Sequence, residues 1–239
     1  MKALILNSGM GTRMGQYTKE HPKCMTDLLN GETILSRQLR LLERAGVRDV
    51  VITTGHFRDV LIDYCNSLGL SLDYTFVHNA VYDKTNYIYS IYCARDVLHD
   101  QDIIMLHGDL VFEESVLRDV LAFDNSCMKV SSTLALPEKD FKAVIDNGIV
   151  KKVGVEFFEN AMEAQAMYKL NKAEWQMWLD KICEFCETDR RSCYAEKALN
   201  EITDDCTVYA YDVKDRLCAE IDTPEDWETV LHRLQKCAE

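Results

Sequence analysis

The sequence has little that would separate domains, because it contains only three prolines and ten glycines in 239 residues. No stretch is rich in serine, glycine or proline, and no segment repeats with a period of 20–50 residues. Basic residues are also few: 27 lysines and arginines oppose 40 aspartates and glutamates, which gives a net charge of −13. We therefore expect one domain, residues 1–239, that binds no nucleic acid. The oligomeric state is not predicted, and both a monomer and a homodimer fit the sequence.

A membrane-spanning segment is missing as well, because no apolar run reaches 18 residues. Signal-peptide and lipidation patterns are not found, so we expect a cytoplasmic protein without a membrane partner. The ten cysteines, from Cys24 to Cys237, are then expected to be reduced thiols. Cys183 and Cys186, with Cys193 nearby, have a metal-like spacing. They lie in a helical pattern without a second pair at zinc-finger spacing, which favours buried thiols over zinc.

The first 23 residues predict a phosphate-binding loop. The apolar run Ala3–Leu6 predicts a buried strand, and Gly9 and Gly11 in the following loop let consecutive N–H groups converge on an anion. Arg13 and Lys23 add positive charge. The segment lacks the third glycine of a dinucleotide fingerprint and the Gly-Lys-Ser/Thr step of a P-loop.

This segment resembles the sugar-nucleotidyltransferase pattern Leu-x-x-Gly-x-Gly-Thr-Arg followed by Pro-Lys, here residues 6–13 and 22–23. The chain is similar to nucleotidyltransferases of the glycosyltransferase-A-like fold, and most closely to the small bacterial cytidylyltransferases that make CDP-choline or CMP-aminoethylphosphonate. The resemblance implies catalytic roles for Arg13 and Lys23. It implies nucleotide contacts from Leu6, Asn7, Ser8, Gly9, Met10, Gly11, Thr12, Arg13 and Lys23. Asn7 and Ser8 replace the small residues usual in this family.

Strand and helix patterns alternate along the chain, which predicts an α/β, Rossmann-like fold with a mostly parallel sheet covered by helices on both faces. An Asn-Gly step at residues 147–148 predicts a hairpin, which we interpret as part of a small antiparallel inserted lobe. We expect a nucleotide-binding part (1–136), an acceptor-binding lobe (137–212), and a closing strand with a C-terminal helix (213–239). Further predicted strands are 49–54, 72–78, 102–107, 129–136, 143–145, 149–153, 207–212 and 217–221; predicted helices are 33–45, 59–68, 87–98, 114–123 and 172–186.

Residues 78–90 are unusually polar and aromatic for a connection. The resemblance places pyrimidine recognition here, in an Asn-x-x-x-Ser step that corresponds to Asn86 and Ser90. Amide and hydroxyl groups suit cytosine, which offers an acceptor and a donor together. Alternatively, Thr85 or Asn86 opens a helix as its N-cap. The predicted nucleotide-binding residues outside the first loop are Asn79, Thr85, Asn86, Ser90 and Gly108.

Two aspartates are predicted metal ligands. Gly108 releases Asp109 at the carboxyl end of a buried strand, the edge where such sheets bind ligands. A nucleoside triphosphate brings Mg²⁺, which takes one or two carboxylates. The family resemblance implies Asp109 and Asp222 as the Mg²⁺ ligands. Alternatively, Asp109 caps the next helix and Asp222 belongs to a surface turn before the helix start at Thr223 and Pro224.

No Ser-His-Asp or Cys-His arrangement is found, which fits a reaction whose nucleophile is already an ionised phosphate or phosphonate oxygen. The resemblance implies CTP as donor, and we expect CMP transfer to a small phosphonate such as 2-aminoethylphosphonate, with release of pyrophosphate. Predicted acceptor-binding residues are Lys139, Lys142 and Lys152 for the anionic end and Tyr194 and Glu196 for the ammonium. The alternatives are a phosphocholine cytidylyltransferase, a sugar-1-phosphate nucleotidyltransferase, a glycosyltransferase and a non-catalytic nucleotide-binding relative.

Overall fold

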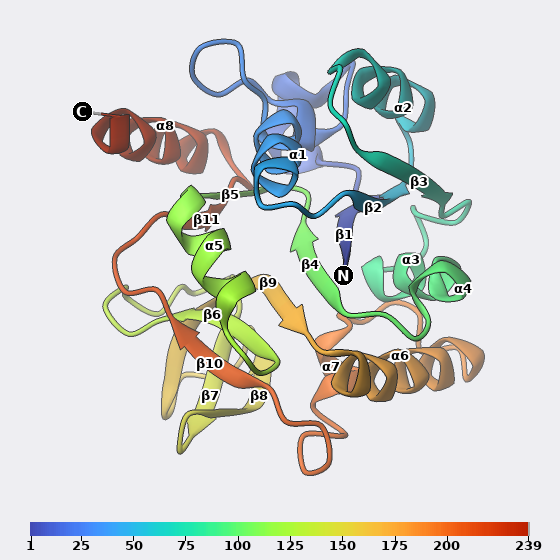
Figure 1. The fold of residues 1–239 in the computed structure, drawn as a ribbon, viewed down its shortest axis with the longest axis vertical. Coiled ribbons are helices and arrows are strands. Elements are labelled where there is room, and N and C mark those ends of the chain that lie inside the picture. The colour runs from blue at the N-terminus through green and yellow to red at the C-terminus, as the bar shows by residue number, and fades with distance from the viewer. Residues whose placement is uncertain (239) are drawn as a thin grey trace.

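Strand β1 (Lys2–Asn7) lies inside the main sheet of the computed structural model, which describes residues 1–238 (Figure 1). It pairs in parallel with β2 (Asp49–Thr54) on one side and β4 (Ile103–His107) on the other. β3 (Asp73–His78) pairs in parallel with β2 and forms the edge. This half of the sheet has the predicted parallel arrangement, so the carboxyl ends of β1 and β4 meet at one edge.

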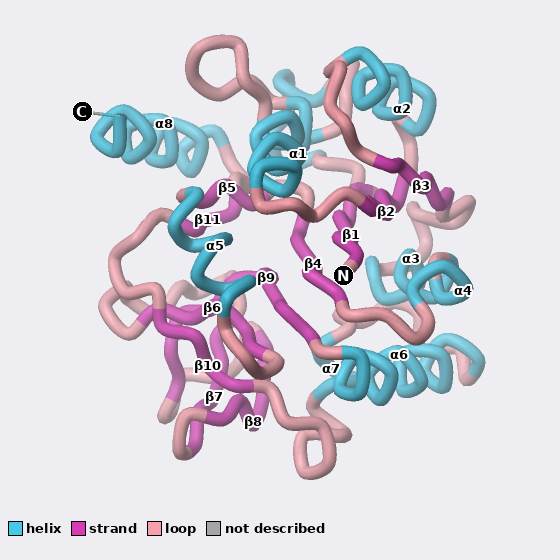
Figure 2. Tube along the Cα trace, viewed as in Figure 1, coloured by secondary structure: helices cyan, strands magenta, loops and turns pink. Residues whose placement is uncertain are grey.

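The other half of the sheet is mixed. β9 (Ala161–Leu170) pairs antiparallel with β4 and with β6 (Cys127–Ser131), and β6 pairs in parallel with β10 (Tyr209–Asp212). The predicted hairpin is present as β7 (Lys142–Asp146) and β8 (Ile149–Gly154). Figure 2 shows these strands gathered on the side of the molecule away from β2 and β3. Within residues 1–238 the strand order is β3-β2-β1-β4-β9-β6-β10-β8-β7.

Helices cover both faces of the sheet. The side chains of β1 alternate between the two faces and therefore contribute to two separate cores. Ala3 and Ile5 face one core, which includes residues of α1 (Ile34–Arg44), α2 (Arg58–Ser67) and α5 (Glu114–Ala122). Leu4 and Leu6 face the other core, which includes residues of α3 (Tyr87–Cys93), α4 (Arg95–Leu98), α6 (Lys172–Glu187) and α7 (Glu196–Leu199). None of the helices in residues 1–238 is long and apolar enough to cross a membrane.

A separate two-stranded ribbon joins the middle of the chain to its end. β5 (Leu110–Phe112) pairs antiparallel with β11 (Cys218–Glu220), and the N–H of Ile221 donates to the carbonyl of Asp109 at 3.0 Å. α8 (Pro224–Ala238) follows, and its start carries the predicted capping box, in which Thr223 and Asp226 bond reciprocally. The short 3₁₀ helices η1 (Thr12–Thr18) and η2 (Lys23–Met25) lie in the first loop.

The main differences between the predicted and the observed elements concern β5, β9, the end of β6 and the division between α3 and α4. β5 and β9 were not predicted, and the strand predicted at 129–136 ends at Ser131. Its hydroxyl accepts the N–H groups of Thr133 and Leu134, which ends the ladder. The helix predicted at 87–98 is divided at Ala94. β9 was missed because its buried run contains Glu163, Gln165 and Lys169, which interrupt the apolar pattern of a strand.

The polar residues of β9 are paired inside the protein. Lys129 on β6 is fully buried, and its Nζ lies 2.5 Å from Glu163 Oε2. Gln165 donates to the other oxygen of Glu163 at 3.0 Å. The cost of desolvating the two charges offsets much of their attraction, so the intact pair adds little net stability. Removing one partner is costly, because the other charge then stays buried alone.

We expect Glu163→Gln to lower the free energy of unfolding by about 3 kcal/mol, because it leaves the Lys129 ammonium buried without a counter-charge. Glu114→Gln is the matched control. Glu114 pairs with Arg44 at the surface, so its substitution should change stability by no more than about 0.5 kcal/mol. Urea unfolding of both variants measures the difference. Equal stabilities of the two variants would contradict the importance of the buried pair.

Candidate active site

A cleft of about 380 Å³ opens at the carboxyl ends of β1 and β4. The predicted loop residues on its wall are Leu6, Asn7, Gly9, Met10, Gly11, Thr12, Arg13 and Lys23. The predicted residues Asn86, Gly108, Asp109, Lys139, Tyr194 and Asp222 also line it. Ser8 is buried and does not line the cleft. Residues predicted from distant parts of the sequence therefore share one cavity.

Lys23 lies between the two predicted metal ligands. Its Nζ is 2.5 Å from Asp222 Oδ1 and also contacts Asp109 Oδ2. Burial alone would lower the pKa of Lys23, but the charges of Asp109 and Asp222 raise it above its ordinary value. Burial opposes ionisation of Asp109 too, yet the charge of Lys23 leaves its pKa lowered. Arg13 adds a contact to Asp222, 2.9 Å from Nη1 to Oδ2, with its side chain largely exposed.

The β5–β11 ribbon explains why the aspartates meet. Asp109 immediately precedes β5, Asp222 follows β11 by one residue, and the backbone bond between Ile221 and Asp109 continues the pairing. Antiparallel strands bring the start of one beside the end of the other. The sequence placed each aspartate at a strand end but could not show this pairing.

Two glycines allow the close packing around Lys23 and Asp109. Gly11 has φ of 64°, and a Cβ there would lie 3.1 Å from the Cβ of Lys23. A Cβ at Gly108 would lie 1.6 Å from Asn7 Oδ1. Any larger residue at position 108 would therefore displace the end of β1 from the end of β4.

His107 and Glu220 form a second polar pair in the wall of the cleft. His107 Nδ1 lies 2.9 Å from Glu220 Oε1. Burial would lower the pKa of His107, but the bond and charge of Glu220 raise it to about 9. Neither residue was predicted, although each precedes an aspartate by two positions, a spacing that places both side chains on one face of an extended strand.

The acids of the cleft suit a hard divalent cation. Two groups have ligand atoms within 4.8 Å of one another: His107, Asp109 and Glu220, and Asp140, Glu220 and Asp222. Asp109 Oδ1 is buried and has no hydrogen-bond partner in the described residues, so it can accept a ligand. Carboxylate oxygens are the donors that Mg²⁺ and Mn²⁺ prefer.

Aromatic side chains wall the cleft around His107. Tyr87 packs edge-on against His107 with centroids 4.7 Å apart, and Tyr194 packs edge-on against Phe141 at 5.1 Å. The ring centroids of Tyr87 and Tyr194 are 5.9 Å apart. Tyr87, Phe141 and Asp140 line the cleft and were not among the predicted site residues. A planar or cationic group would find apolar faces here, next to carboxylates.

Three of the predicted base-binding residues bond to one another instead of lining the cleft. The amide of Asn79 donates to the hydroxyls of Thr85 and Ser90 at 3.0 and 3.1 Å. Asn86 is the N-cap of α3, as one alternative predicted, and its Oδ1 accepts the N–H of Tyr87. Asn86 also lines the cleft, so capping does not remove it from the site.

Three of the predicted acceptor-binding residues lie elsewhere. Glu196 is buried and accepts hydrogen bonds from the hydroxyls of Tyr87 and Tyr168, so it holds the aromatic wall from behind. Lys142 is buried and donates to the carbonyls of Pro137 and Glu138. These positions leave neither side chain free for a ligand in the cleft.

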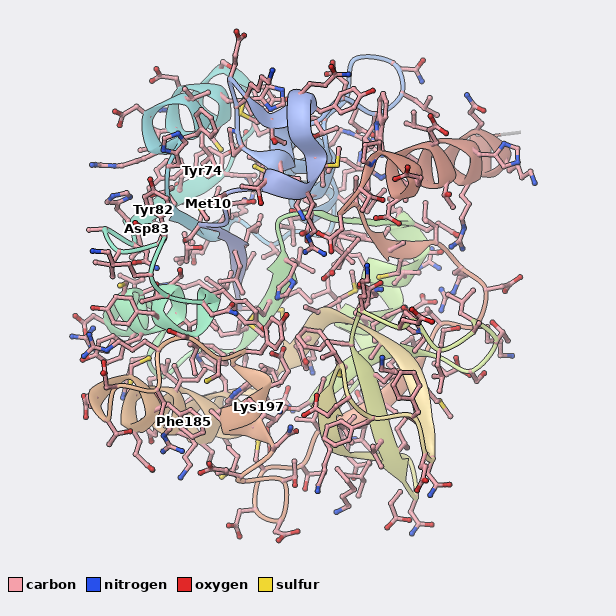
Figure 3. The ribbon with its side chains drawn as sticks, turned by 180° about the vertical axis from the view of Figure 1, so that it is seen from behind. Met10, Tyr74, Tyr82, Asp83, Phe185 and Lys197 are labelled. Carbon is pink, nitrogen blue, oxygen red and sulfur yellow. The ribbon has the colours of Figure 1, made fainter. Side chains whose placement is uncertain are left out.

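Lys152 faces a different hollow, which is also lined by Phe185 and Lys197. Figure 3 labels these two residues in the lower part of the molecule, away from Met10 of the first loop. The cysteines that the structure describes are free thiols, and none belongs to a group close enough to hold a metal. Of the three cysteines with the metal-like spacing, Cys186 is buried as expected, whereas Cys183 and Cys193 are only half-buried.

Residues 3–131 match the MobA-like NTP transferase domain. The chain is 29% identical over 214 residues to CTP:phosphoglutamine cytidylyltransferase of Campylobacter jejuni, covering 82% of each protein. It is 34% identical over 122 residues to CMP-5′-(3-aminopropyl)phosphonate synthase of Streptomyces rubellomurinus, covering 51% of this chain and 19% of that protein.

The fold is similar to the structure of CTP:phosphocholine cytidylyltransferase from Streptococcus pneumoniae, with a TM-score of 0.77, 18% identity and 98% of each chain covered. This similarity confirms the predicted α/β fold with a central sheet and flanking helices. The family match covers the Gly-rich loop, Lys23 and Asp109, which meet in the cleft. The chain is a nucleotidyltransferase that belongs to the MobA-like NTP transferase family.

Proposed function

We propose that the protein transfers CMP from CTP to a small phosphonate or phosphate and releases pyrophosphate. The main support for the proposal is that Lys23 contacts both Asp109 and Asp222 in a cleft that the Gly-rich loop also lines. Such a cluster supplies mobile positive charge and metal-binding carboxylates where a triphosphate would lie. The relatives named above, both cytidylyltransferases by name or product, support cytidine as the nucleoside.

The residues of the cleft divide the work of phosphoryl transfer. The N–H groups of Gly9 and Gly11 and the exposed guanidinium of Arg13 would hold the outgoing pyrophosphate. Lys23 would turn from the carboxylates to the α-phosphate as charge develops there. Asp109 and Asp222 would hold Mg²⁺, which neutralises phosphate charge when bound. No base is needed, because the attacking oxygen of the acceptor is already ionised.

The aromatic wall and Asp140 support an acceptor that carries an amine. Within the described residues, no cation lies at ion-pair distance from Asp140, and burial and the charges of Asp222 and Asp226 raise its pKa. A primary ammonium would relieve this repulsion and donate hydrogen bonds, while Lys139 lies on the same cleft wall for the anionic end. We therefore propose 2-aminoethylphosphonate or a similar amino-phosphonate, with Asp140 in the role first expected for Glu196.

Lys23→Ala should lower kcat by about 100-fold or more while changing the KM for nucleotide much less, because the charge matters most in the transition state. The variant should also bind Mn²⁺ more tightly without nucleotide, because Lys23 no longer neutralises the two aspartates. Steady-state kinetics and Mn²⁺ titration by electron paramagnetic resonance measure these effects. Lys19→Ala, an exposed lysine outside the cleft, is the control. If the variant has a raised KM and an unchanged kcat, Lys23 contributes to substrate binding and not to transition-state stabilisation.

Asp109→Asn and Asp222→Asn should each abolish Mg²⁺-dependent turnover without unfolding the protein, because each removes a metal-binding charge. Pyrophosphate release measured against Mg²⁺ concentration tests this, and circular dichroism checks the fold. A variant that keeps wild-type activity at the wild-type Mg²⁺ requirement would exclude that aspartate as a ligand.

Among the four ribonucleoside triphosphates, CTP should give the fastest pyrophosphate release. The carboxamide of Asn86 supports this preference, because its cap uses Oδ1 and Nδ2 makes no hydrogen bond within residues 1–238. Asn86→Asp keeps the cap but removes this donor, and should reduce the preference for CTP over UTP. Equal rates with CTP and UTP for the wild type would reject cytidine selectivity.

Among acceptors, 2-aminoethylphosphonate should show a higher kcat/KM than phosphocholine. Its ammonium can donate three hydrogen bonds to carboxylates, whereas a quaternary ammonium donates none. Asp140→Asn should reduce turnover of 2-aminoethylphosphonate more than that of phosphocholine. Phosphoglutamine, which also carries a primary amine, completes the panel. A higher kcat/KM for phosphocholine would overturn the choice of acceptor and leave cytidylyl transfer standing.

A further inference from the structure

Unpartnered polar atoms are concentrated at the edge of the sheet where the cleft opens. In the described residues, seven buried side-chain nitrogen or oxygen atoms have no hydrogen-bond partner. Four of them lie at the carboxyl ends of β1 and β4: Asn7 Nδ2, Ser8 Oγ, His107 Nε2 and Asp109 Oδ1. Buried polar atoms are nearly always bonded in proteins, so such a group indicates a ligand that completes it.

Asn7 is held in one place by its neighbours. Its backbone N–H donates to Thr53 Oγ1 at 3.1 Å. Its carboxamide lies against Gly108, where an added Cβ would be only 1.6 Å from Asn7 Oδ1. The residue is 9% exposed and lines the cleft beside Asp109. The carboxamide is therefore fixed before any ligand enters, which lowers the entropic cost of binding one.

The chemistry of this carboxamide matches a hydroxyl group. Asn7 offers a donor, Nδ2, which is buried without a hydrogen-bond partner in residues 1–238, and an acceptor, Oδ1, which lies against Gly108. A hydroxyl both donates and accepts, whereas a phosphate oxygen only accepts and would be repelled by Oδ1. Phosphate already has Arg13 and Lys23 in the same cleft.

We infer that Asn7 binds a hydroxyl of the ribose and makes the protein selective for ribonucleoside over deoxyribonucleoside triphosphates. The sugar joins the base to the α-phosphate. Asn7 is two residues before Gly9 in the phosphate-binding loop, and its carboxamide lies against Gly108, the neighbour of Asp109. A pocket that hydrogen-bonds a substrate hydroxyl rejects an analogue without it, because its own polar atoms then lose their partner. The inference rests on the proposed nucleotidyl transfer.

The test compares binding of CTP, 2′-deoxy-CTP and 3′-deoxy-CTP by calorimetry with Mg²⁺ and no acceptor. The wild type should bind CTP about 10-fold or more tightly than at least one deoxy analogue, and Asn7→Leu should reduce that ratio to within about 3-fold. Leucine has a similar shape and removes both polar atoms. Because these atoms are unpartnered without nucleotide, the unliganded variant should melt no lower than the wild type.

Thr54→Val is the matched control. Thr54 is paired with Asn7 in register, is buried and does not line the cleft, so its substitution should leave the CTP to deoxy-CTP ratio unchanged. Asn7→Ser, with a shorter side chain, serves if Asn7→Leu does not fold.

Three results would overturn the inference while leaving nucleotidyl transfer intact. They are a wild type without preference for ribose, an Asn7 variant with the wild-type ratios, and an equal loss of affinity for all three nucleotides. If the protein binds another nucleoside triphosphate more tightly than CTP, the same comparison is made with that nucleotide and its deoxy analogues. If no nucleoside triphosphate binds, both the inference and the proposed function fail.

Discussion

The contact of Lys23 with Asp109 and Asp222 is the constraint on which the site depends. It joins three distant segments, since Lys23 and Asp222 are 199 positions apart in the chain. A lone buried carboxylate would be costly, and two adjacent ones would repel each other. The ammonium makes this cluster tolerable in the free protein, and the same ammonium is what a triphosphate needs. In the proposed reaction, the Lys23 charge that stabilises the free protein would also act on the triphosphate.

The rest of the fold can be understood as support for this contact. Parallel pairing of β1 with β4 sets the Gly-rich loop beside Asp109, and the β5–β11 ribbon sets Asp222 beside both. A third apolar cluster fastens the ribbon and α8 to the first loop through Met14, Val111, Leu217 and Val230. Hydrophobic burial thereby positions charged groups that would otherwise stay in solvent.

Local signals could be predicted from the sequence, and long-range pairings could not. The first strand, the glycines, Lys23 and Asp109 follow from neighbouring residues, as does the cap at Thr223. The polar strand β9 was hidden because its charges find partners only in the folded sheet, as Lys129 does with Glu163. Glu196 was predicted to bind the acceptor, but the structure shows it buried behind Tyr87, a position that no local signal in the sequence reveals.

The β5–β11 ribbon has a consequence for the order in which the molecule matures. Because Asp222 follows the last strand, a chain still being synthesised can hold the complete Gly-rich loop, Lys23 and Asp109 without it. In that intermediate Lys23 has one carboxylate partner instead of two. The proposed site is therefore complete only after the last strand has paired with β5.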